Sequence, residues 1–408
     1  MAQGNTAFLH TQGGAVGANM TFYIGRSEGQ GAAKQHKDSE SRCYGVVHAA
    51  HLGSRSGYET IDDKEKIVFQ LHEIMHGSYD KVNMKIGICV KGWLTGLLLL
   101  LCLSPVVAGV RIAVISDLNG SYGSTRYRSD VDRAVQRIVS LRPDLVISTG
   151  DMVAGQRTSP SLGQPQLLRM WRAFHEHVTV SLEKAGLPLA VTPGNHDASV
   201  YGEFHLEREI YIHTWQQHKP ALHFVDDGHY PLYYAFEIRK VLFVSLDATA
   251  NGRLEPRQKT WLTELFEDQG QHYAQKIVFS HLPLWPVAQK RENGALFDEE
   301  LEKILQDNGV SLYLNGHHHS YYPGFKDGIR YVSQACLGAG PRKLIGDDRV
   351  SQRSITLIGI PDEGMPRVQA LGGRDFDQPV DIHSLPERIV TRKATLVRED
   401  LALPALEK

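Results

Sequence analysis

The chain has 408 residues, of which 42% are hydrophobic and 22% charged, and its formal net charge is −2. This composition is typical of globular proteins, and the length allows one large domain or two. The near-neutral charge gives no electrostatic footprint for nucleic acid, whose binding proteins are usually basic. The four cysteines form no CxxC pair, so neither a disulfide framework nor a structural zinc site is indicated.

Residues 84–108 have the features of a secretory signal peptide: lysines, an apolar run, then a proline and the small residues Val-Val-Ala. We expect cleavage after Ala108 and a periplasmic or secreted protein. The alternative is an uncleaved membrane anchor with the later residues facing outside. An anchor needs about 20 apolar residues, whereas Lys91 and Pro105 interrupt this run.

The 83 residues before Met84 are rich in Gly, Ser, Gln and His and show little sustained periodicity. A signal peptide belongs at the start of a chain, so we interpret residues 1–83 as a non-native or disordered extension. A genuine cytoplasmic extension is the alternative, and residues 63–76 offer it one short amphipathic helix.

From residue 109 onward, short apolar runs alternate with amphipathic helical patterns, which predicts a layered α/β domain. The first part predicts strands over 110–116, 144–149 and 188–193 and helices over 129–141, 165–185 and 203–215. The runs 231–238 and 240–249 predict a hairpin across Arg239-Lys240. Further elements are a helix over 256–269, strands over 276–280 and 311–315 around a helix over 295–308, and closing strands over 329–335 and 354–360. We expect the domain to span 109–371, with a loosely attached C-terminal tail over 372–408.

Five apolar runs end in residues that can bind metals, and the side chains at such strand ends converge on the ligand crevice of an open α/β sheet. A single Asp there is also a good turn former or helix N-cap, but five such blocks in order predict a metal site. The blocks are Asp117-Leu118-Asn119, Gly150-Asp151, Gly194-Asn195-His196-Asp197, His281 and Gly316-His317-His318-His319.

These blocks resemble the calcineurin-like metallophosphoesterases, a superfamily that includes purple acid phosphatases and many bacterial phosphodiesterases. The family's blocks read D-x-H, G-D, G-N-H-D or G-N-H-E, a lone His, and G-H-x-H. The match spans residues 111–321 and departs from the pattern only at Asn119. The resemblance implies an α/β/β/α sandwich with mixed β-sheets and a metal site at the C-terminal ends of the strands.

The resemblance also implies two divalent or trivalent metal ions. Two ions about 3.5–4 Å apart need a bridging carboxylate, and by resemblance Asp151 is that bridge. Mixed imidazole and carboxylate ligation favours iron, zinc or manganese over calcium. In an extended segment His318 points away from its neighbours, so we assign it no metal role. The implied ligands are Asp117 and His319 for the first ion, and Asn195, His281 and His317 for the second.

Hydrolysis of a phosphoric ester by a metal-bridging hydroxide is the implied activity, with a small-molecule or macromolecular ester as substrate. By resemblance His196 protonates or stabilises the leaving oxygen, and Asp197 orients His196. We expect no membrane contact except through the signal segment if it stays uncleaved. The alternative is a non-catalytic binding or scaffold protein of the same fold with a weakened first metal site.

Asn119 stands where the first block of the family has histidine, and a neutral amide binds metals more weakly than imidazole does. Purple acid phosphatases also lack that histidine and use a tyrosine three residues after the bridging aspartate, where this chain has Ala154. Three interpretations stay open: Asn119 is a direct or water-mediated ligand, Tyr122 takes its place, or Asn119 only caps the next turn.

Other polar and aromatic residues carry weaker signals. His175 and His177 are two positions apart on a predicted helix and do not face together, so we interpret them as surface residues. Asp247 either steers a ligand or caps a loop, and we favour the cap. Arg126 and Arg128 either meet substrate or face solvent, and three aromatic residues either line a cleft or pack in the core: Trp285, Tyr321 and Tyr322.

Overall fold

The computed structural model describes residues 109–338 and 340–403. The predicted extension over 1–83 and the predicted signal peptide over 84–108 lie outside the described residues. Within the described ranges, no helix combines the length and the apolar character needed to span a membrane.

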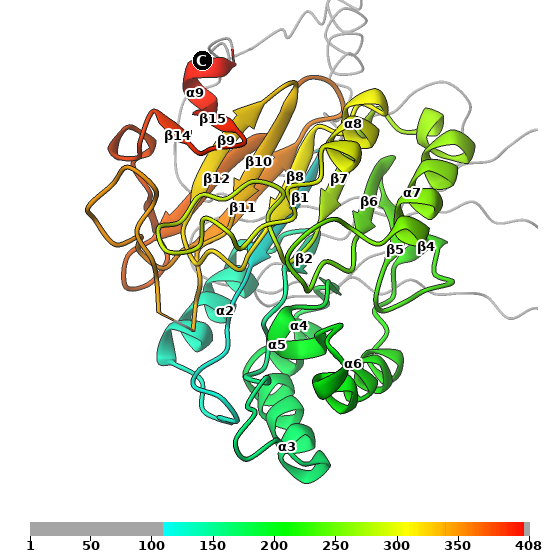
Figure 1. The fold of residues 1–408 in the computed structure, drawn as a ribbon, viewed down its shortest axis with the longest axis vertical. Helices are drawn as coiled ribbons and strands as arrows, with labels where there is room; N and C mark the ends of the chain where they lie inside the picture. The colour runs from blue at the N-terminus through cyan, green and yellow to red at the C-terminus, as the bar shows by residue number, and fades with distance from the viewer. Residues whose placement is uncertain (1–108, 339, 404–408) are drawn as a thin grey trace, which may run out of the picture. The chain divides into compact units, whose positions relative to one another are not determined.

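The first sheet has six strands in the order β13-β12-β11-β1-β2-β3 (Figure 1). Strands β1, β2 and β3 are parallel, and β11 joins β1 in the antiparallel sense, so the sheet is mixed. Near-continuous apolar runs such as VRIAVI suit β1 and β2 because both of their faces are covered. The bounds are β1 Val110–Ile115, β2 Leu145–Ser148, β3 Leu189–Val191, β11 Ile355–Ile360, β12 Arg367–Gly372 and β13 Gln378–Pro379.

The second sheet has nine strands in the order β14-β15-β9-β10-β8-β7-β6-β5-β4. Strands β6, β7, β8 and β10 are parallel, and antiparallel strands flank them on both sides. The bounds are β4 His223–Asp226, β5 Tyr234–Ile238, β6 Val241–Ser245, β7 Gln275–Phe279, β8 Leu312–Asn315, β9 Tyr322–Lys326, β10 Ile329–Ser333, β14 Arg388–Val390 and β15 Thr395–Arg398.

The predicted hairpin is formed by β5 and β6, which pair antiparallel. Its two connecting residues, Arg239 and Lys240, both have positive φ, at 46° and 64°. Two consecutive residues with positive φ are what a two-residue hairpin turn of the twisted sheet requires.

The helices cover the outer faces of the two sheets. In α2 the buried residues recur at helical spacing, from Val131 through Ala134 and Val135 to Ile138, so one stripe packs on the first sheet. The predicted helix over 165–185 is α3 and α4 joined by a π-helical turn at His175–Thr179. The bounds are α2 Ser129–Leu141, α3 Gln164–Phe174, α4 Val180–Lys184, α5 Asn195–Ala198, α6 His205–Gln217, α7 Pro256–Asp268, α8 Glu299–Asp307 and α9 Glu399–Ala402.

Side chains of β6 alternate between the two faces of the second sheet, as the period of a strand requires. Phe243 joins the large core that includes the first sheet and helices α2, α3 and α6. Leu242 and Val244 point the other way, into a second core beneath α7 and α8. The layers therefore run α/β/β/α, which confirms the predicted sandwich (Figure 1).

Residues 372–403 are part of the sandwich, which corrects the expectation of a loosely attached tail. Strand β15 pairs with β9 at the edge of the second sheet, and Ile389 and Leu396 are buried. Arg330 in β10 donates from Nε and Nη2 to a carboxylate oxygen of Glu399, at 2.8 and 2.6 Å. The scattered prolines and charges of this segment concealed its short strands, because at most two residues of each are buried.

Candidate metal centre

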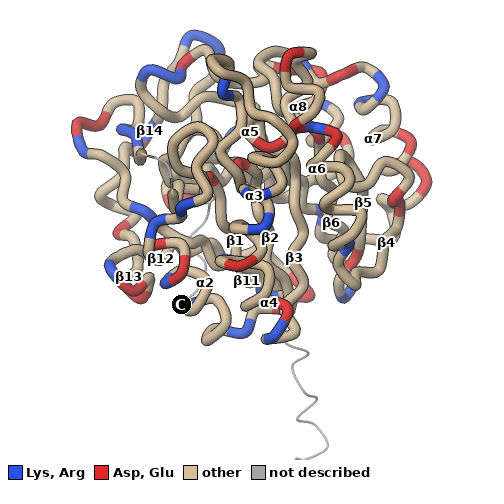
Figure 2. The backbone as a smooth tube through the Cα atoms, turned by 90° about the horizontal axis from the view of Figure 1, so that it is seen from below, with Lys and Arg blue, Asp and Glu red and all other residues tan. Residues whose placement is uncertain are grey.

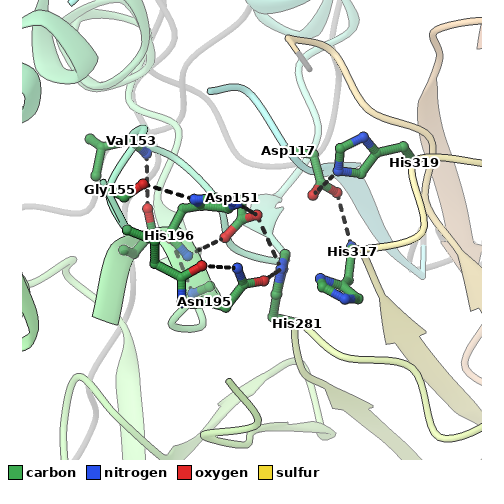
Figure 3. A network of polar contacts seen from close by, with 12 residues as sticks. Asp117, Asp151, Val153, Gly155, Asn195, His196, His281, His317 and His319 are labelled. Carbon is green, nitrogen blue, oxygen red and sulfur yellow. Dashed lines mark hydrogen bonds and ion pairs between the residues drawn. The ribbon is translucent and has the colours of Figure 1, made fainter. Parts of the chain in front are cut away.

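The five predicted blocks directly follow strands β1, β2, β3, β7 and β8, three from the first sheet and two from the second. Because these strands run parallel within each sheet, their carboxyl ends bring the blocks to one edge of the sandwich. Figure 3 shows Asp117 close to His317 and His319, and Asp151 close to Asn195, His196 and His281.

Four predicted ligands have left-handed backbone, a region that residues with a side chain rarely adopt. The φ angles are 49° for Asp117, 55° for Asp151, 63° for His317 and 53° for His319. Backbone hydrogen bonds hold Asp117 and Asp151 in place. The N–H of Asp117 donates to the carbonyl of Gly150 at 3.0 Å, and the N–H of Leu118 donates to the carbonyl of Asp151 at 2.9 Å. Such strain clusters at functional sites, where the surrounding structure fixes it.

Two glycines of the motif are required because neighbouring atoms lie where a Cβ would be. A Cβ on Gly194 would lie 2.0 Å from the backbone nitrogen of Asp151 and 2.3 Å from its Oδ1. A Cβ on Gly316 would lie 2.0 Å from Oγ of Ser116 and 2.8 Å from Oδ2 of Asp117. The glycines of the third and fifth blocks therefore let the chain pack directly against the two carboxylates.

Two sets of three ligand atoms meet at Asp151. In one set Asp151 is joined by Asp117 and His319, in the other by His281 and His317, and within each set the ligand atoms lie within 4.8 Å of one another. All five residues are buried except His317, which is half-buried. A carboxylate shared by two such sets is the arrangement that two neighbouring ions require.

The first set is built around the carboxylate of Asp117. Nε2 of His319 lies 3.0 Å from its Oδ1, while Ser116 Oγ and His317 N donate to Oδ2 at 2.7 and 3.1 Å. Burial opposes ionisation of Asp117, but the imidazole of His319 outweighs it and lowers the pKa of the carboxyl to about 2. Nδ1 of His319 donates to the carbonyl of Gly340 at 2.9 Å, which turns Nε2 toward the site.

The second set is built around His281. Its Nδ1 donates to the carbonyl of Thr149 at 2.8 Å, and its Nε2 lies 3.3 Å from Oδ2 of Asp151 and 3.0 Å from Oδ1 of Asn195. Burial disfavours the charged imidazole, but the carboxylate of Asp151 outweighs it and raises the pKa of His281 to about 9. Burial likewise opposes ionisation of Asp151, and His281 and His196 outweigh it and lower its pKa. A bound cation would take the place of the proton on Nε2, because metal ligands must be deprotonated.

Asn119 provides the test of whether the first set fits a metal. It is 4% exposed, and its side-chain oxygen Oδ1 is buried without a hydrogen-bond partner. A buried oxygen without a donor is costly unless a cation uses it, and a turn cap would have shown a donor there. Tyr122 is 58% exposed and its ring packs against His196, with centroids 5.3 Å apart. The donor set therefore fits two ions, and Asn119 suits the first ion better than Tyr122 does.

His196 is held beside the shared carboxylate. Its backbone N–H donates to Oδ1 of Asp151 at 2.8 Å, and its Nε2 lies 3.9 Å from Oδ2 of the same residue. Nδ1 contacts the carbonyl of Gly155 at 3.0 Å; since a carbonyl only accepts, Nδ1 carries the hydrogen.

Asp197 differs from its predicted role of orienting the His196 ring. Its carboxylate instead accepts the backbone N–H groups of Val153 and Gly194, at 2.8 and 3.0 Å. Burial and the neighbouring charge of Asp151 raise the pKa of Asp197 to about 7. Asp197 therefore fastens the loop after β2 to the start of α5, and the carbonyl of Gly155 orients the imidazole.

Both ring nitrogens of His318 are used in hydrogen bonds to the backbone. Its Nδ1 accepts from the backbone N–H groups of Val287 and Ala288, and Nε2 donates to the carbonyl of Gly294 at 2.8 Å. Burial lowers its pKa to about 3, which keeps the ring neutral.

The residues with weaker signals have structural partners. Asp247 is not a loop cap, because its buried carboxylate forms an ion pair with Arg208. Arg128 pairs with Asp130, and His177 pairs with Asp132. His175 is half-buried and its Nδ1 contacts Oγ1 of Thr179, so it is not a free surface residue. The three aromatic residues are buried: Trp285 and Tyr322 pack in the core, and Tyr321 also lines a pocket beside Leu344 and Arg349.

Sequence reasoning missed three residues that contact the site: Gly155, Gln156 and Glu207. Gln156 accepts a hydrogen bond from the side chain of Asn195, and Glu207 accepts from the backbone of Gln156. A Gly-Gln pair after a strand is typical of any loop, and Glu207 comes from a helix far along the chain. No local pattern distinguishes them.

Comparison with known proteins agrees with the motif. A family model described as calcineurin-like phosphoesterase matches residues 110–321. A purple acid phosphatase from yellow lupin (Lupinus luteus) seeds superposes with a TM-score of 0.50 at 15% identity, over 67% of this chain and 52% of that chain. A dimetal phosphatase from Danio rerio superposes with a TM-score of 0.47 at 15% identity, over 67% and 98% of the two chains. No curated protein matches in sequence.

Likeness at 15% identity shows the fold alone, whereas the family match carries the motif residues themselves. It covers just over half of the chain, and the residues it includes gather into the site described above. The chain therefore belongs to the calcineurin-like phosphoesterase family.

Proposed function

We propose that the protein is a dinuclear-metal-dependent hydrolase of phosphoric esters. The observation that carries this proposal is the shared carboxylate: Asp151 belongs to both sets of ligand atoms. Of the residues described, Asp117, Asn119 and His319 would complete the first ion's ligands, and Asn195, His281 and His317 the second's. Iron, zinc or manganese suits this mixture of imidazole, amide and carboxylate.

When bound, two such ions would supply Lewis-acid polarisation of the phosphoryl group and activation of water. The chain's own contribution is to place donors and protons. His196 is suited to protonating the leaving oxygen, because Nδ1 is committed to Gly155 and a second proton would sit on Nε2. General acid help of this kind is typically worth about 10²–10⁴-fold in rate.

The substrate is proposed to be a small-molecule or macromolecular phosphate ester. Acidic and basic residues are interspersed along the loops in Figure 2, without a wide field of one sign in that view. Such a surface gives no support to a nucleic-acid partner. Export of the protein stays part of the proposal and rests on the signal-like sequence over 84–108.

The second candidate is a non-catalytic binding or scaffold protein of the same fold. The observation that favours it is Asn119, a weaker donor than the family's histidine at this position.

One assay separates the two. Purified protein is supplied with manganese or zinc and tested on nitrophenyl phosphate and on its bis-ester. Metal-dependent turnover of either compound supports the enzyme, and the preferred compound names the ester class. Fewer than two bound metals without turnover of either would support the scaffold.

A further inference from the structure

Only one of the two ends of the Asn195 side-chain amide can bind a cation. Its oxygen can ligate a metal, whereas its NH₂ group presents only hydrogens. In the structure Oδ1 lies on the ligand side, 3.0 Å from Nε2 of His281, and Nδ2 donates to Oε1 of Gln156 at 2.8 Å. Gln156 thus contacts the end of the amide that must not face the metal.

We propose that Gln156 is a positioning residue that fixes the amide of Asn195 with its oxygen toward the second ion. The inference rests on the proposed dinuclear site. The terminal torsion of asparagine is soft and close to two-fold, so its own geometry does not choose between the two orientations. Two contacts match the observed orientation: Nε2 of His281 faces the amide oxygen, and Oε1 of Gln156 accepts from the amide nitrogen. The acceptor on Gln156 therefore holds the nitrogen end of the amide away from the ligand side.

The backbone of Gln156 is held in place. Its backbone has a φ of 63°, and its N–H donates to both carboxylate oxygens of Glu207, at 2.9 and 3.1 Å. Glu207 is 5% exposed and belongs to α6, which anchors this contact in the helical layer.

The neighbouring Gly155 locks the same segment against His196. A Cβ on Gly155 would lie 2.2 Å from the carbonyl oxygen of His196 and 2.5 Å from Oε2 of Glu207, so only glycine fits. Gly155 N–H donates to the carbonyl of His196 at 3.1 Å, and its carbonyl accepts from Nδ1 of the same residue at 3.0 Å. The two-residue segment 155–156 thus sets both the amide of Asn195 and the imidazole of His196.

The test compares three substitutions of Gln156. Gln156→Leu keeps the approximate volume and removes the acceptor. Gln156→Glu presents acceptors only. Gln156→Asn places an acceptor one methylene too far back, and asparagine tolerates positive φ well, so this variant has no added backbone strain. Gln289→Leu is the matched control, because Gln289 is also a half-buried glutamine and its amide donates only to backbone carbonyls of another loop.

Each protein is loaded with manganese and dialysed against a chelator, and the metal content per chain and the release rate are measured. We expect Gln156→Leu and Gln156→Asn to release one of two ions about 10–100-fold faster, the usual range for loss of a residue that supports a ligand. Gln156→Glu and Gln289→Leu should retain both ions like the wild type. Excess manganese should restore the turnover of nitrophenyl phosphate by Gln156→Leu.

Equal metal retention in the wild type, Gln156→Leu and Gln156→Asn would overturn the inference while leaving the proposed function intact. Equal loss in Gln156→Leu and Gln156→Glu would also overturn it, because packing and not the acceptor would then matter. If the wild type binds no metal and hydrolyses no ester, the proposed function fails, and the inference fails with it.

Discussion

The backbone N–H of His317 donates a 3.1 Å hydrogen bond to Oδ2 of Asp117, from 200 positions further along the chain. The contact joins the first motif block to the last and ties the two sheets at the site. Both residues also have left-handed backbone. The ligand geometry is therefore a property of the whole sandwich.

Asp151→Ala should abolish the dinuclear site, because the shared carboxylate is the only negative charge that belongs to both ligand sets. We expect turnover of nitrophenyl phosphate to fall by about 10³-fold or more, since each 1.4 kcal/mol of lost stabilisation is worth tenfold. Elemental analysis gives the metal content, with Asp132→Ala, a partly exposed aspartate paired with His177, as control. Two metals per chain in Asp151→Ala would contradict the bridging role.

His196→Ala should keep both metals and lose about 10²–10⁴-fold in turnover, because the imidazole is placed to donate a proton and not to ligate. The loss should shrink for esters with good leaving groups, which need no proton. Nitrophenyl and alkyl phosphates are compared in the same variant. An equal loss on both would show that His196 orients the substrate instead.

Asn119→His should slow release of the first ion to a chelator, because imidazole is the stronger donor and the side-chain oxygen of Asn119 is buried without a partner. Metal retention is the readout, since activity need not follow affinity. Tyr122→Phe should leave metal content unchanged, because Tyr122 is exposed and packs on His196. Faster metal release from Tyr122→Phe would transfer the ligand role to tyrosine.

The long elements and the motif could be predicted from the sequence. The helical pattern over 129–141 coincides with α2, and the five blocks follow five strands. The C-terminal strands could not, because β14 and β15 are short strands near the edge of the sheet with one or two buried residues each. The contact between Gln156 and Asn195 could not be predicted either. It joins two loops and depends on the packing of α6, so no spacing of residues in the sequence indicates it.

His175 should make stability fall as the pH drops. Burial, with a contribution from the nearby His218, lowers its pKa from 6.5 to about 4. The folded state thus resists protonation, so its contribution is complete above pH 6.5 and is lost as the pH falls from 6.5 toward 4. His175→Phe should flatten this part of the melting-temperature profile. The metal site titrates in both proteins, so the difference between the profiles isolates His175, and identical profiles would contradict the prediction.

Arg330→Ala should destabilise the domain by about 3–5 kcal/mol, the usual cost of leaving one partner of a buried ion pair alone. Glu399 would lose the two contacts that hold α9 to β10. Denaturant unfolding measures the change. Lys303→Ala is the control, because its pair with Asp307 is exposed and worth less than about 1 kcal/mol. Equal stability of the two variants would mean that the Arg330–Glu399 pair adds nothing to the stability of the fold.

The distribution of the ligands over the two sheets makes any bound ion a removable cross-link between layers. Asp117, Asp151 and Asn195 follow strands of the six-stranded sheet, and His281, His317 and His319 follow strands of the nine-stranded sheet. An ion that binds only when both sheets are in register stabilises that register by mass action. Metal binding and the cohesion of the sandwich are thereby coupled, and the protein without metal would be the less stable form.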